Sequence, residues 1–227
     1  MMAEAIQDME SRLADAARAL GIALLPQQSQ ALLAYVAQMQ RWNRTYNLTA
    51  IRDPEQMLVQ HVFDSLSIVK PLRQALAGDN VPAGATIVDV GSGGGLPGVV
   101  LAVMEPAWQV HCVDAVEKKT AFVRQMAGAL RLSNLHAVHA RVETLAPFNA
   151  QVVVSRAFAS LKDFASLAGV HVAPDGWLLA MKGREPDDEI LALESHTPWR
   201  VARIDRLDVP ELDAQRCVVW MSRQGNP

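Results

Sequence analysis

The residues with the clearest chemical potential are an aspartate, Asp89, and the glycines that follow it. These glycines are Gly91, Gly93, Gly94 and Gly95. Glycine adopts positive φ easily and lets a ligand approach the backbone closely. The β-branched residues 87–90 predict a buried strand before the glycines, and Pro97 is typical of the first turn of a helix after them. A strand, a glycine loop and a helix start predict a site for a nucleotide-type ligand, because free N–H groups face it there.

The spacing of the glycines distinguishes two classes of cofactor. The dinucleotide pattern G-x-G-x-x-G fails when it is counted from Gly91, because Leu96 occupies its last position. Counted from Gly93 it reaches Gly98, but it then begins too late after the strand. An acidic residue, one apolar residue and G-x-G-x-G resemble the first motif of class I methyltransferases, which bind S-adenosylmethionine. In that interpretation the Asp89 carboxylate orients the loop or binds the ammonium group of the cofactor.

A second acidic residue, Asp114, ends the next predicted strand, which covers residues 109–113. An acid at this place accepts a ribose hydroxyl in both NAD-binding and S-adenosylmethionine-binding proteins. Asp114 therefore supports the fold and a cofactor contact, and it does not separate the two cofactors.

A basic residue, Arg156, follows the fourth predicted strand. Ligands bind at the carboxyl edge of such a sheet, which favours a functional role over a structural ion pair. The sequence lacks the Asn/Asp-Pro-Pro-Tyr type of motif used for exocyclic amines and a Pro-Cys nucleophile for pyrimidine C5. Both absences favour an acceptor atom with a free lone pair, which needs positioning and electrostatics but no general base.

The elements that must position these residues follow from hydrophobic periodicity. Amphipathic helices are predicted over residues 4–20 and 27–46, with two helical pieces between 54 and 76. In the second helix an apolar stripe is expected to contain Leu32, Leu33, Val36, Met39 and Tyr46. The turn-rich residues 77–86 mark the end of this helical region, which we place at 1–80.

Strands and helices alternate from residue 81 to 227, which predicts an α/β fold with a mostly parallel sheet of seven strands. The strands are expected at 86–90, 109–113, 135–139, 151–155, 176–181, 199–207 and 215–222, the last of them antiparallel. The helices are expected at 97–104, 117–130, 161–172 and 187–194.

Composition and charge restrict the class of protein. The 227 residues are 50% hydrophobic with a net charge of −3, which argues against indiscriminate nucleic-acid binding. The charge is nevertheless sorted, with bases concentrated in 117–156 and acids in 185–213. Cys112 and Cys217 are expected as buried thiols, and no metal site is expected. A signal peptide and a membrane helix are not evident, so a cytoplasmic protein without membrane contact is expected.

Most of the chain resembles the glucose-inhibited division protein B family of ribosomal RNA small-subunit methyltransferases. The stretches that carry the resemblance are WNRTYNLTAIRDPEQMLVQHVFDSL (42–66), DVGSGGGLPGVVLA (89–102), RVE (141–143), VVSRAFASL (153–161) and MKG (181–183). The resemblance implies a Rossmann-like class I methyltransferase domain at 81–227. It also implies transfer of a methyl group from S-adenosylmethionine to N7 of one guanine in the 530 loop of 16S rRNA.

The resemblance also implies roles for individual residues. The cofactor contacts would be Asp89, Gly91, Gly93, Leu96, Asp114, Val142, Glu143 and Arg156. Arg156 would also lie beside the methyl donor as the catalytic residue. The family's pattern suggests that Arg124 and Arg141 contact RNA or the cofactor. Together with Lys118 and Lys182 they are the expected RNA contacts, with 16S rRNA, within a 30S particle, as the partner of a monomeric enzyme. His61 and Asp64 share a helix face and are expected to be structural.

Other functions remain open at this stage. A class I methyltransferase acting on a small molecule or a protein is the nearest alternative, although the sorted charge disfavours it. An NAD-dependent oxidoreductase would need a catalytic Tyr-x-x-x-Lys or a histidine pair, and neither Tyr35 nor Tyr46 belongs to such a motif. A binding module without catalysis is disfavoured by the complete set of Asp89, Gly91, Asp114 and Arg156.

Overall fold

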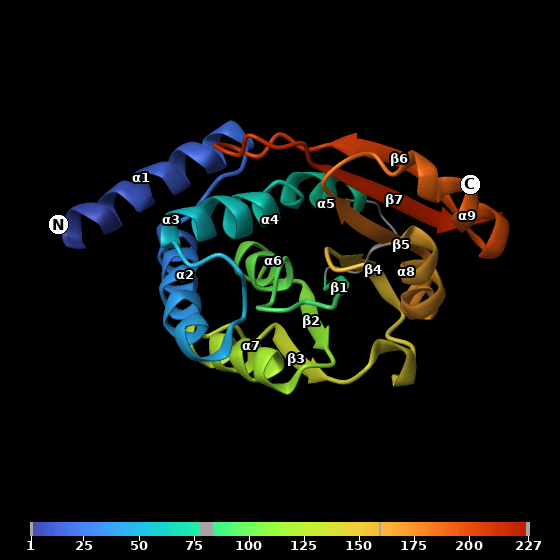
Figure 1. The fold of residues 1–227 in the computed structure, drawn as a ribbon, viewed down its shortest axis with the longest axis horizontal. Coiled ribbons are helices and arrows are strands. Elements are labelled where there is room, and N and C mark those ends of the chain that lie inside the picture. The colour runs from blue at the N-terminus through green and yellow to red at the C-terminus, as the bar shows by residue number, and fades with distance from the viewer. Residues whose placement is uncertain (1, 78–83, 159, 226–227) are drawn as a thin grey trace.

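The computed structural model describes residues 2–77, 84–158 and 160–225. Its centre is a seven-stranded sheet with the strand order β3-β2-β1-β4-β5-β7-β6 (Figure 1). The strands are β1 (Thr86–Val90), β2 (Gln109–Asp114), β3 (Leu135–His139), β4 (Ala150–Ser155), β5 (Val172–Lys182), β6 (Trp199–Arg206) and β7 (Cys217–Arg223). Among the strands of the described residues, only β7 runs antiparallel to its neighbours, β5 and β6. The predicted fold class is therefore confirmed.

Helices cover both faces of the sheet. Strand residues alternate between two hydrophobic clusters, so that Ile87 packs into one and Val88 into the other. The first cluster also contains buried residues of α6 (Gly98–Met104) and α7 (Glu117–Ala129), and the second contains those of α8 (Leu161–Ala168) and α9 (Asp187–His196). This alternation is the period of two that buries both faces of a strand.

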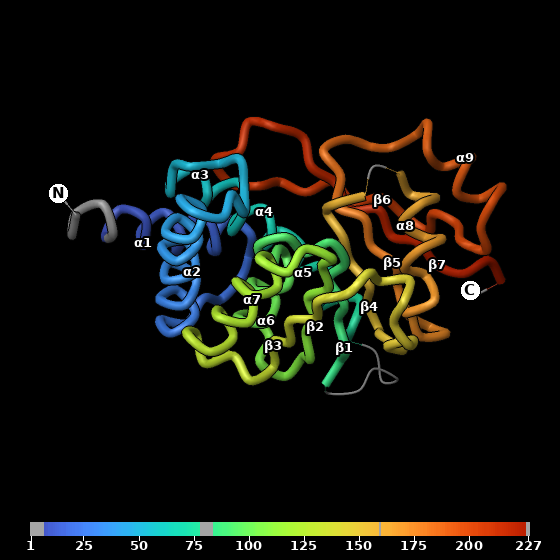
Figure 2. Tube along the Cα trace, turned by 60° about the horizontal axis from the view of Figure 1, so that its bottom comes forward, coloured from blue at the N-terminus to red at the C-terminus, as the bar shows by residue number. Residues whose placement is uncertain are grey.

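The N-terminal helices join the first of these clusters. They are α1 (Met2–Ala19), α2 (Pro26–Tyr46), α3 (Pro54–Met57), α4 (Asp64–Leu66) and α5 (Val69–Ala75). Figures 1 and 2 both show α2 beside α6 and α7. The expected stripe of α2 is right at Leu32, Val36 and Met39, which are buried, and wrong at Tyr46, which is 43% exposed. Tyr35 takes the buried place instead, against Phe122 of α7.

A π-helical segment, η1 (Leu58–Phe63), lies between α3 and α4. Sequence periodicity predicts helix here but does not distinguish the wider π turn. Such segments are rare and often occur at functional sites. The first of the two predicted helical pieces between 54 and 76 is thus the continuous stretch of α3, η1 and α4, which ends at Leu66. The second is α5.

The prediction of a helix over 161–172 is wrong at its end. The α-helix stops at Ala168, a 3₁₀ turn, η3 (Gly169–His171), follows, and β5 begins at Val172 rather than at residue 176. Val172 pairs with Ala150 of β4, and the register shifts before the next pair, Val152 with Trp177. Gly176 allows this irregular approach, because a Cβ there would lie 2.8 Å from the Ala150 carbonyl oxygen.

The remaining elements agree with the predicted ones to within a few residues. Both cysteines are free and buried, as expected. Most of the turn-rich segment 77–86 lies outside the described residues.

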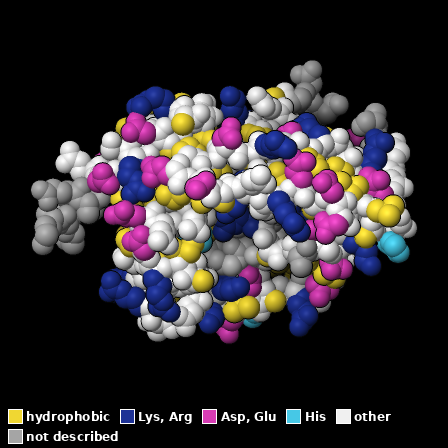
Figure 3. Space-filling model, turned by 45° about the horizontal axis from the view of Figure 1, so that its top comes forward, with side chains coloured by type: hydrophobic (Ala, Val, Ile, Leu, Met, Phe, Trp, Pro, Cys, Tyr) yellow, Lys and Arg dark blue, Asp and Glu magenta, His cyan; other side chains and the backbone are white. Residues whose placement is uncertain are grey.

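Figure 3 shows Lys and Arg side chains around a hollow near the middle of one face of the molecule.

Candidate active site

The glycine loop, residues 91–98, follows β1 directly and leads into α6. Gly91, Gly93 and Gly95 have φ values of +68°, +59° and +86°. These values lie in the left-handed region, which glycine adopts without strain. At Gly91 a Cβ would also lie 2.8 Å from the Cβ of Ala157, whereas at Gly93 it would meet nothing within 4 Å. The loop is therefore packed at Gly91 and open at Gly93.

Asp89 lies in β1 and contacts the end of the glycine loop. Its side chain is fully buried, and Oδ2 accepts a hydrogen bond of 2.8 Å from the Gly98 amide at the start of α6. Burial raises the pKa of this carboxyl from 3.8 to about 7, although the Gly98 hydrogen bond opposes the rise. Oδ1 is buried and has no hydrogen-bond partner in the described structure. Asp89 is therefore bound to the end of the glycine loop, and its role toward a cofactor stays a prediction.

Asp114 holds the loop from the neighbouring strand. Its Oδ2 accepts from the Gly93 amide at 2.9 Å, and its Oδ1 accepts from the Val116 amide at 2.8 Å. The ammonium of Lys119 lies 3.7 Å from Oδ2. Each carboxylate oxygen has further lone pairs, so these bonds leave acceptor capacity for a ligand hydroxyl.

A cavity of about 200 Å³ opens above the loop. Its lining residues are Met39, Leu48, Thr49, His61, Gly91, Ser92, Gly93, Gly94, Leu96, Arg156 and Ala157. We call it the loop cavity. Among the predicted cofactor residues, Gly91, Gly93, Leu96 and Arg156 line it, whereas Asp89 and Asp114 do not line it and instead accept hydrogen bonds from the loop backbone.

The second helix, α2, forms one wall of this region. The Tyr35 hydroxyl donates a 2.8 Å hydrogen bond to the Gly94 carbonyl. A Cβ at position 94 would lie 2.5 Å from the Cε of Met39. The N-terminal helices therefore fix the outer side of the loop, which the sequence motif alone did not reveal.

A second cavity, of about 370 Å³, adjoins the first. We call it the arginine cavity. It is lined by Ile51, Gln60, His61, Asp64, Arg156, Met181, Lys182, Gly183, Leu207, Arg216 and Cys217. His61 and Arg156 line both cavities, so they mark the boundary between them.

Three side chains from distant segments meet in the arginine cavity. The Oδ2 of Asp64 lies 2.8 Å from Nη1 of Arg156, and its Oδ1 lies 3.0 Å from Nε of Arg216. We call this group the arginine clamp. The sequence indicated Arg156 as functional and Asp64 as structural, but it gave no sign of Arg216, which directly precedes β7.

His61 projects from the π-helical segment between the two cavities. Its Nε2 lies 3.0 Å from the Thr49 hydroxyl, and its Nδ1 is buried without a hydrogen-bond partner in the described structure. Burial, and then the positive charge of Arg156, lower the pKa of His61 to about 4. The imidazole is therefore neutral at physiological pH.

Val142 and Glu143 lie on a 3₁₀ turn, η2 (Val142–Thr144), which follows β3. Val142 is buried in the second cluster, and its carbonyl lies 3.0 Å from Nε2 of His171. Glu143 is exposed and lies 3.8 Å from Arg141, which is itself 75% exposed. Neither Val142 nor Glu143 lines the loop cavity.

The predicted RNA-binding residues fall into two groups. Lys118, Arg124 and Arg141 are exposed. Lys182 is largely buried, and its ammonium lies 3.0 Å from both carboxylate oxygens of Glu189. The acidic run 185–189 is therefore not a uniformly solvated face, because the Glu189 carboxylate has a largely buried cationic partner.

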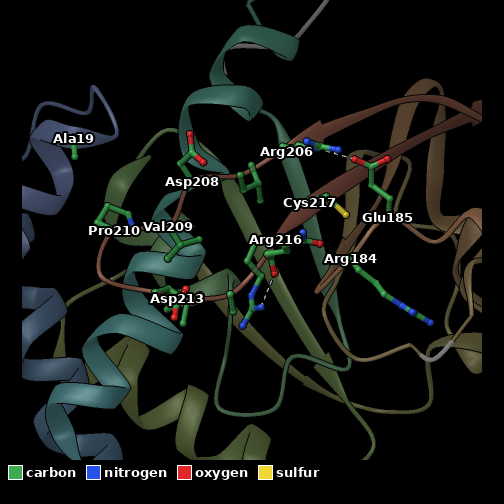
Figure 4. Close-up of a pocket in the computed structure, with 14 residues that line it drawn as sticks. Ala19, Arg184, Glu185, Arg206, Asp208, Val209, Pro210, Asp213, Arg216 and Cys217 are labelled. Atoms are coloured by element: carbon green, nitrogen blue, oxygen red, sulfur yellow. Dashed lines mark hydrogen bonds and ion pairs between the residues drawn. The ribbon is translucent and has the colours of Figure 1, made fainter.

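A third and larger cavity, of about 630 Å³, begins where the arginine cavity ends. The two share Leu207, Arg216 and Cys217. Figure 4 shows Arg206 paired with Glu185 on one side of the third cavity and Arg216 beneath Cys217. Acidic and basic side chains both line it, so it carries no strong net charge.

Comparison with known proteins identifies the family of this chain. The family model of rRNA small subunit methyltransferase G, or GidB, matches residues 28–219. The ribosomal RNA small subunit methyltransferase G of Bordetella pertussis is 64% identical over 216 residues, which cover 95% of this chain and 94% of the relative. The chain belongs to the rRNA small subunit methyltransferase G family. The family member from Bordetella petrii is 63% identical, with coverage of 95% and 84%.

Solved structures agree with the fold. A SAM-dependent methyltransferase from Aquifex aeolicus aligns with a TM-score of 0.51 and 19% identity, covering 74% of this chain and 93% of that one. At this identity the likeness shows the class I methyltransferase fold alone. None of the helices in the described part of the chain is both long and apolar enough to span a membrane.

Proposed function

We propose that this protein transfers a methyl group from S-adenosylmethionine to N7 of one guanine in the 530 loop of 16S rRNA. We further propose that it acts as a monomer in the cytoplasm on RNA held within a 30S particle. Membership of the rRNA small subunit methyltransferase G family supports the substrate class. The features of the site support the cofactor and the kind of acceptor atom.

The residues that line the loop cavity support S-adenosylmethionine as its ligand. Gly91, Gly93 and Leu96 line it, and the missing Cβ of Gly93 leaves open space there. Backbone groups of Gly91 and Leu96 would hold the ligand, and the remaining lone pairs of Asp114 would accept the ribose hydroxyls. Val142 and Glu143 would flank the adenine. When bound, S-adenosylmethionine supplies an electrophilic methyl group.

The choice of the acceptor atom rests on the side chains at the boundary between the loop cavity and the arginine cavity. The ionisable groups that line both cavities are His61 and Arg156, and Asp64 contacts Arg156 from the arginine cavity. His61 has a pKa of about 4, and both oxygens of Asp64 accept from arginines. Asp89 has a pKa near 7, but it is fully buried and lines neither cavity. A boundary at which the described residues supply no poised general base suits guanine N7, whose lone pair needs no deprotonation.

Arg156 is then a positioning and binding group. Methyl transfer to N7 moves a positive charge from sulfur to the guanine ring, so Arg156 has no emerging anion to neutralise. Its guanidinium instead suits the guanine O6, which lies next to N7 on the same edge of the base. Lys118, Arg124, Arg141 and Lys182 stay our proposed RNA contacts, although Lys182 would have to share its ammonium with Glu189.

Nucleoside mass spectrometry of 16S rRNA tests this function. RNA from cells that lack the protein is incubated, as 30S particles, with the purified protein and S-adenosylmethionine. We expect one equivalent of 7-methylguanosine to appear within a fragment of the 530 loop. A different methylated nucleoside, or methylation of protein or small molecules only, would contradict the proposal.

A further inference from the structure

The arginine clamp leaves several hydrogen-bond donors unused. Asp64 is one carboxylate between two guanidinium groups, so the clamp carries a net positive charge. In the described structure, Arg156 uses Nη1 alone, toward Asp64 and the Gln60 carbonyl at 3.5 Å. Arg216 uses Nε toward Asp64 and Nη1 toward the Gln215 carbonyl at 2.8 Å. Nε and Nη2 of Arg156 and Nη2 of Arg216 have no acceptor among the described residues.

These donors face a space of suitable size. The arginine cavity measures about 370 Å³, which is within the usual range for small-ligand sites. The side chains of Arg156 and Arg216 are 24% and 25% exposed, so both guanidiniums are partly shielded from water. Partly shielded arginines with spare donors favour an anionic ligand with several acceptor oxygens, such as a phosphate.

The two arginines differ in their position relative to the loop cavity. Arg156 lines both cavities, whereas Arg216 lines the arginine cavity and the third cavity. In the reaction proposed above, the base must reach the boundary at Arg156, and its N7 must stay free of any hydrogen bond. The phosphate of the same nucleotide then lies farther from the boundary, on the side of Arg216.

We propose that the arginine cavity receives the acceptor nucleotide, that Arg216 binds its phosphate, and that Asp64 is the positioning residue for both arginines. This inference rests on the proposed function for the identity of the base. Asp64 is suited to its role because its side chain is only 6% exposed and each of its oxygens holds one guanidinium. The π-helical turn places Gln60 in the same cavity, where its carbonyl gives Arg156 a second support.

Binding of guanosine 5′-monophosphate and of guanosine separates the base from the phosphate. Calorimetry is performed on the protein saturated with S-adenosylhomocysteine. We expect Arg216→Ala to weaken binding of the monophosphate at least tenfold and to change guanosine binding less than twofold. Arg206→Ala is the matched control, because Arg206 lines the third cavity but not the arginine cavity. Equal binding of the monophosphate to wild type and Arg216→Ala would overturn the proposal, as would no binding to the wild type at millimolar concentration.

Steady-state kinetics on 30S particles test the positioning role of Asp64. We expect Arg216→Ala to raise KM for the particle at least tenfold and to change kcat less than threefold. Asp64→Asn removes a negative charge, so phosphate attraction does not weaken, but the guanidiniums lose their fixed orientation. We therefore expect kcat to fall at least tenfold without a rise in KM. The affinity for S-adenosylhomocysteine should stay within twofold of wild type in both variants, which a general loss of folding would not allow.

The outcomes distinguish this inference from the proposed function. If the wild type forms no 7-methylguanosine, the proposed function fails, and the nucleotide-binding measurement still decides the role of Arg216. If the wild type forms 7-methylguanosine while Arg216→Ala behaves like Arg206→Ala in both assays, the function stands and the inference is wrong. Loss of cofactor affinity in Asp64→Asn in parallel with kcat would refute the positioning role of Asp64.

Discussion

The glycine loop and the arginine clamp lie on opposite sides of one boundary, yet they are built in different ways. The loop consists of consecutive residues, and its shape depends on backbone conformation and on amide hydrogen bonds to Asp89 and Asp114. The clamp consists of side chains that are 92 and 152 positions apart from Asp64 in the sequence. A ligand site made of backbone is thus specified locally, whereas a site made of charged side chains depends on the whole fold.

Substitution of the glycines should have the largest effect. Gly91→Ala combines a positive φ with a close approach to Ala157, and Gly93→Ala has the positive φ alone. A residue other than glycine loses about 1–2 kcal/mol in the left-handed backbone conformation, and a steric overlap of its Cβ with a neighbour costs about 1–3 kcal/mol more. We expect the unliganded loop to relax out of this strained conformation, so that cofactor binding must restore it. The affinity for S-adenosylhomocysteine should then fall roughly a hundredfold in Gly91→Ala and roughly tenfold in Gly93→Ala. Calorimetry measures both.

A double variant shows whether the two sides of the boundary are mechanically linked. Ala157 follows Arg156 directly, so Gly91→Ala would push the segment that carries the clamp arginine. The added substitution Ala157→Gly removes the contact and should recover most of the difference between Gly91→Ala and Gly93→Ala. Equal affinities of the two single variants would show that the approach to Ala157 has no consequence.

Arg156 belongs to the arginine clamp and also lines the loop cavity. Its substitutions separate the contribution of its positive charge from that of the planar guanidinium group. Arg156→Lys keeps the positive charge and loses the planar fork that Asp64 and the base would share. Loss of charge-assisted hydrogen bonds is worth about 1.5–3 kcal/mol, so we expect methyl transfer to fall about ten- to a hundredfold. Arg156→Lys should be nearly as damaging as Arg156→Ala in single-turnover assays. Full activity of the lysine variant would mean that charge alone suffices.

Substitution of Asp114 tests the glycine loop and leaves the residues of the arginine clamp unchanged. Asp114→Ala removes the acceptor of the Gly93 and Val116 amides together with the proposed ribose contact. We expect a ten- to a hundredfold loss of cofactor affinity, because charged hydrogen bonds of this kind contribute about 1.5–3 kcal/mol. Glu117→Ala changes an exposed carboxylate nearby and should bind normally. Unchanged affinity in a folded Asp114→Ala protein would remove Asp114 from the site.

Asp89 gives the stability of the protein a pH dependence that arises at the glycine loop. Its folded pKa of about 7 lies above the ordinary value of 3.8, so the folded state holds a proton that the unfolded state has lost between these values. Its contribution to stability is present below pH 4 and is lost as the pH rises toward 7. One proton corresponds to a slope of at most about 1.4 kcal/mol per pH unit. Asp89→Asn should remove this slope from urea unfolding measured between pH 5 and 7, and an unchanged slope would assign it to other groups.

The smallest expected effect lies outside both regions. Arg124 is exposed on α7, and if it contacts only phosphate, Arg124→Ala should weaken RNA binding modestly. The dependence of log K on log salt should become shallower by about one unit. Cofactor affinity and single-turnover rate should stay at the wild-type level. A changed rate on saturating RNA would place Arg124 closer to the chemistry than the exposed position suggests.

The same contrast explains what the sequence could and could not predict. The strand, loop and helix around Asp89 have local signatures, and so does the alternation that predicts the seven strands. The early start of β5 depends on an irregular pairing with β4, which the local sequence pattern does not predict. Arg216 lies beside an apolar strand in an otherwise acidic part of the chain, and only the sheet order brings it to Asp64. The division of the chain at residue 80 stays a prediction, while Tyr35 and Met39 share a core with the loop.

The strand order also determines when each half of the site can form during synthesis. β7 is made after β6 but lies between β5 and β6, so β6 has no partner in the sheet until β7 emerges. Chains are made from the N-terminus, so a nascent chain ending after β5 already contains the glycine loop, Asp64 and Arg156. It still lacks Arg216, which joins Asp64 when β7 pairs with β5. On the translating ribosome, the cofactor half of the site can therefore be completed first, and the half that would receive RNA closes with the last strand.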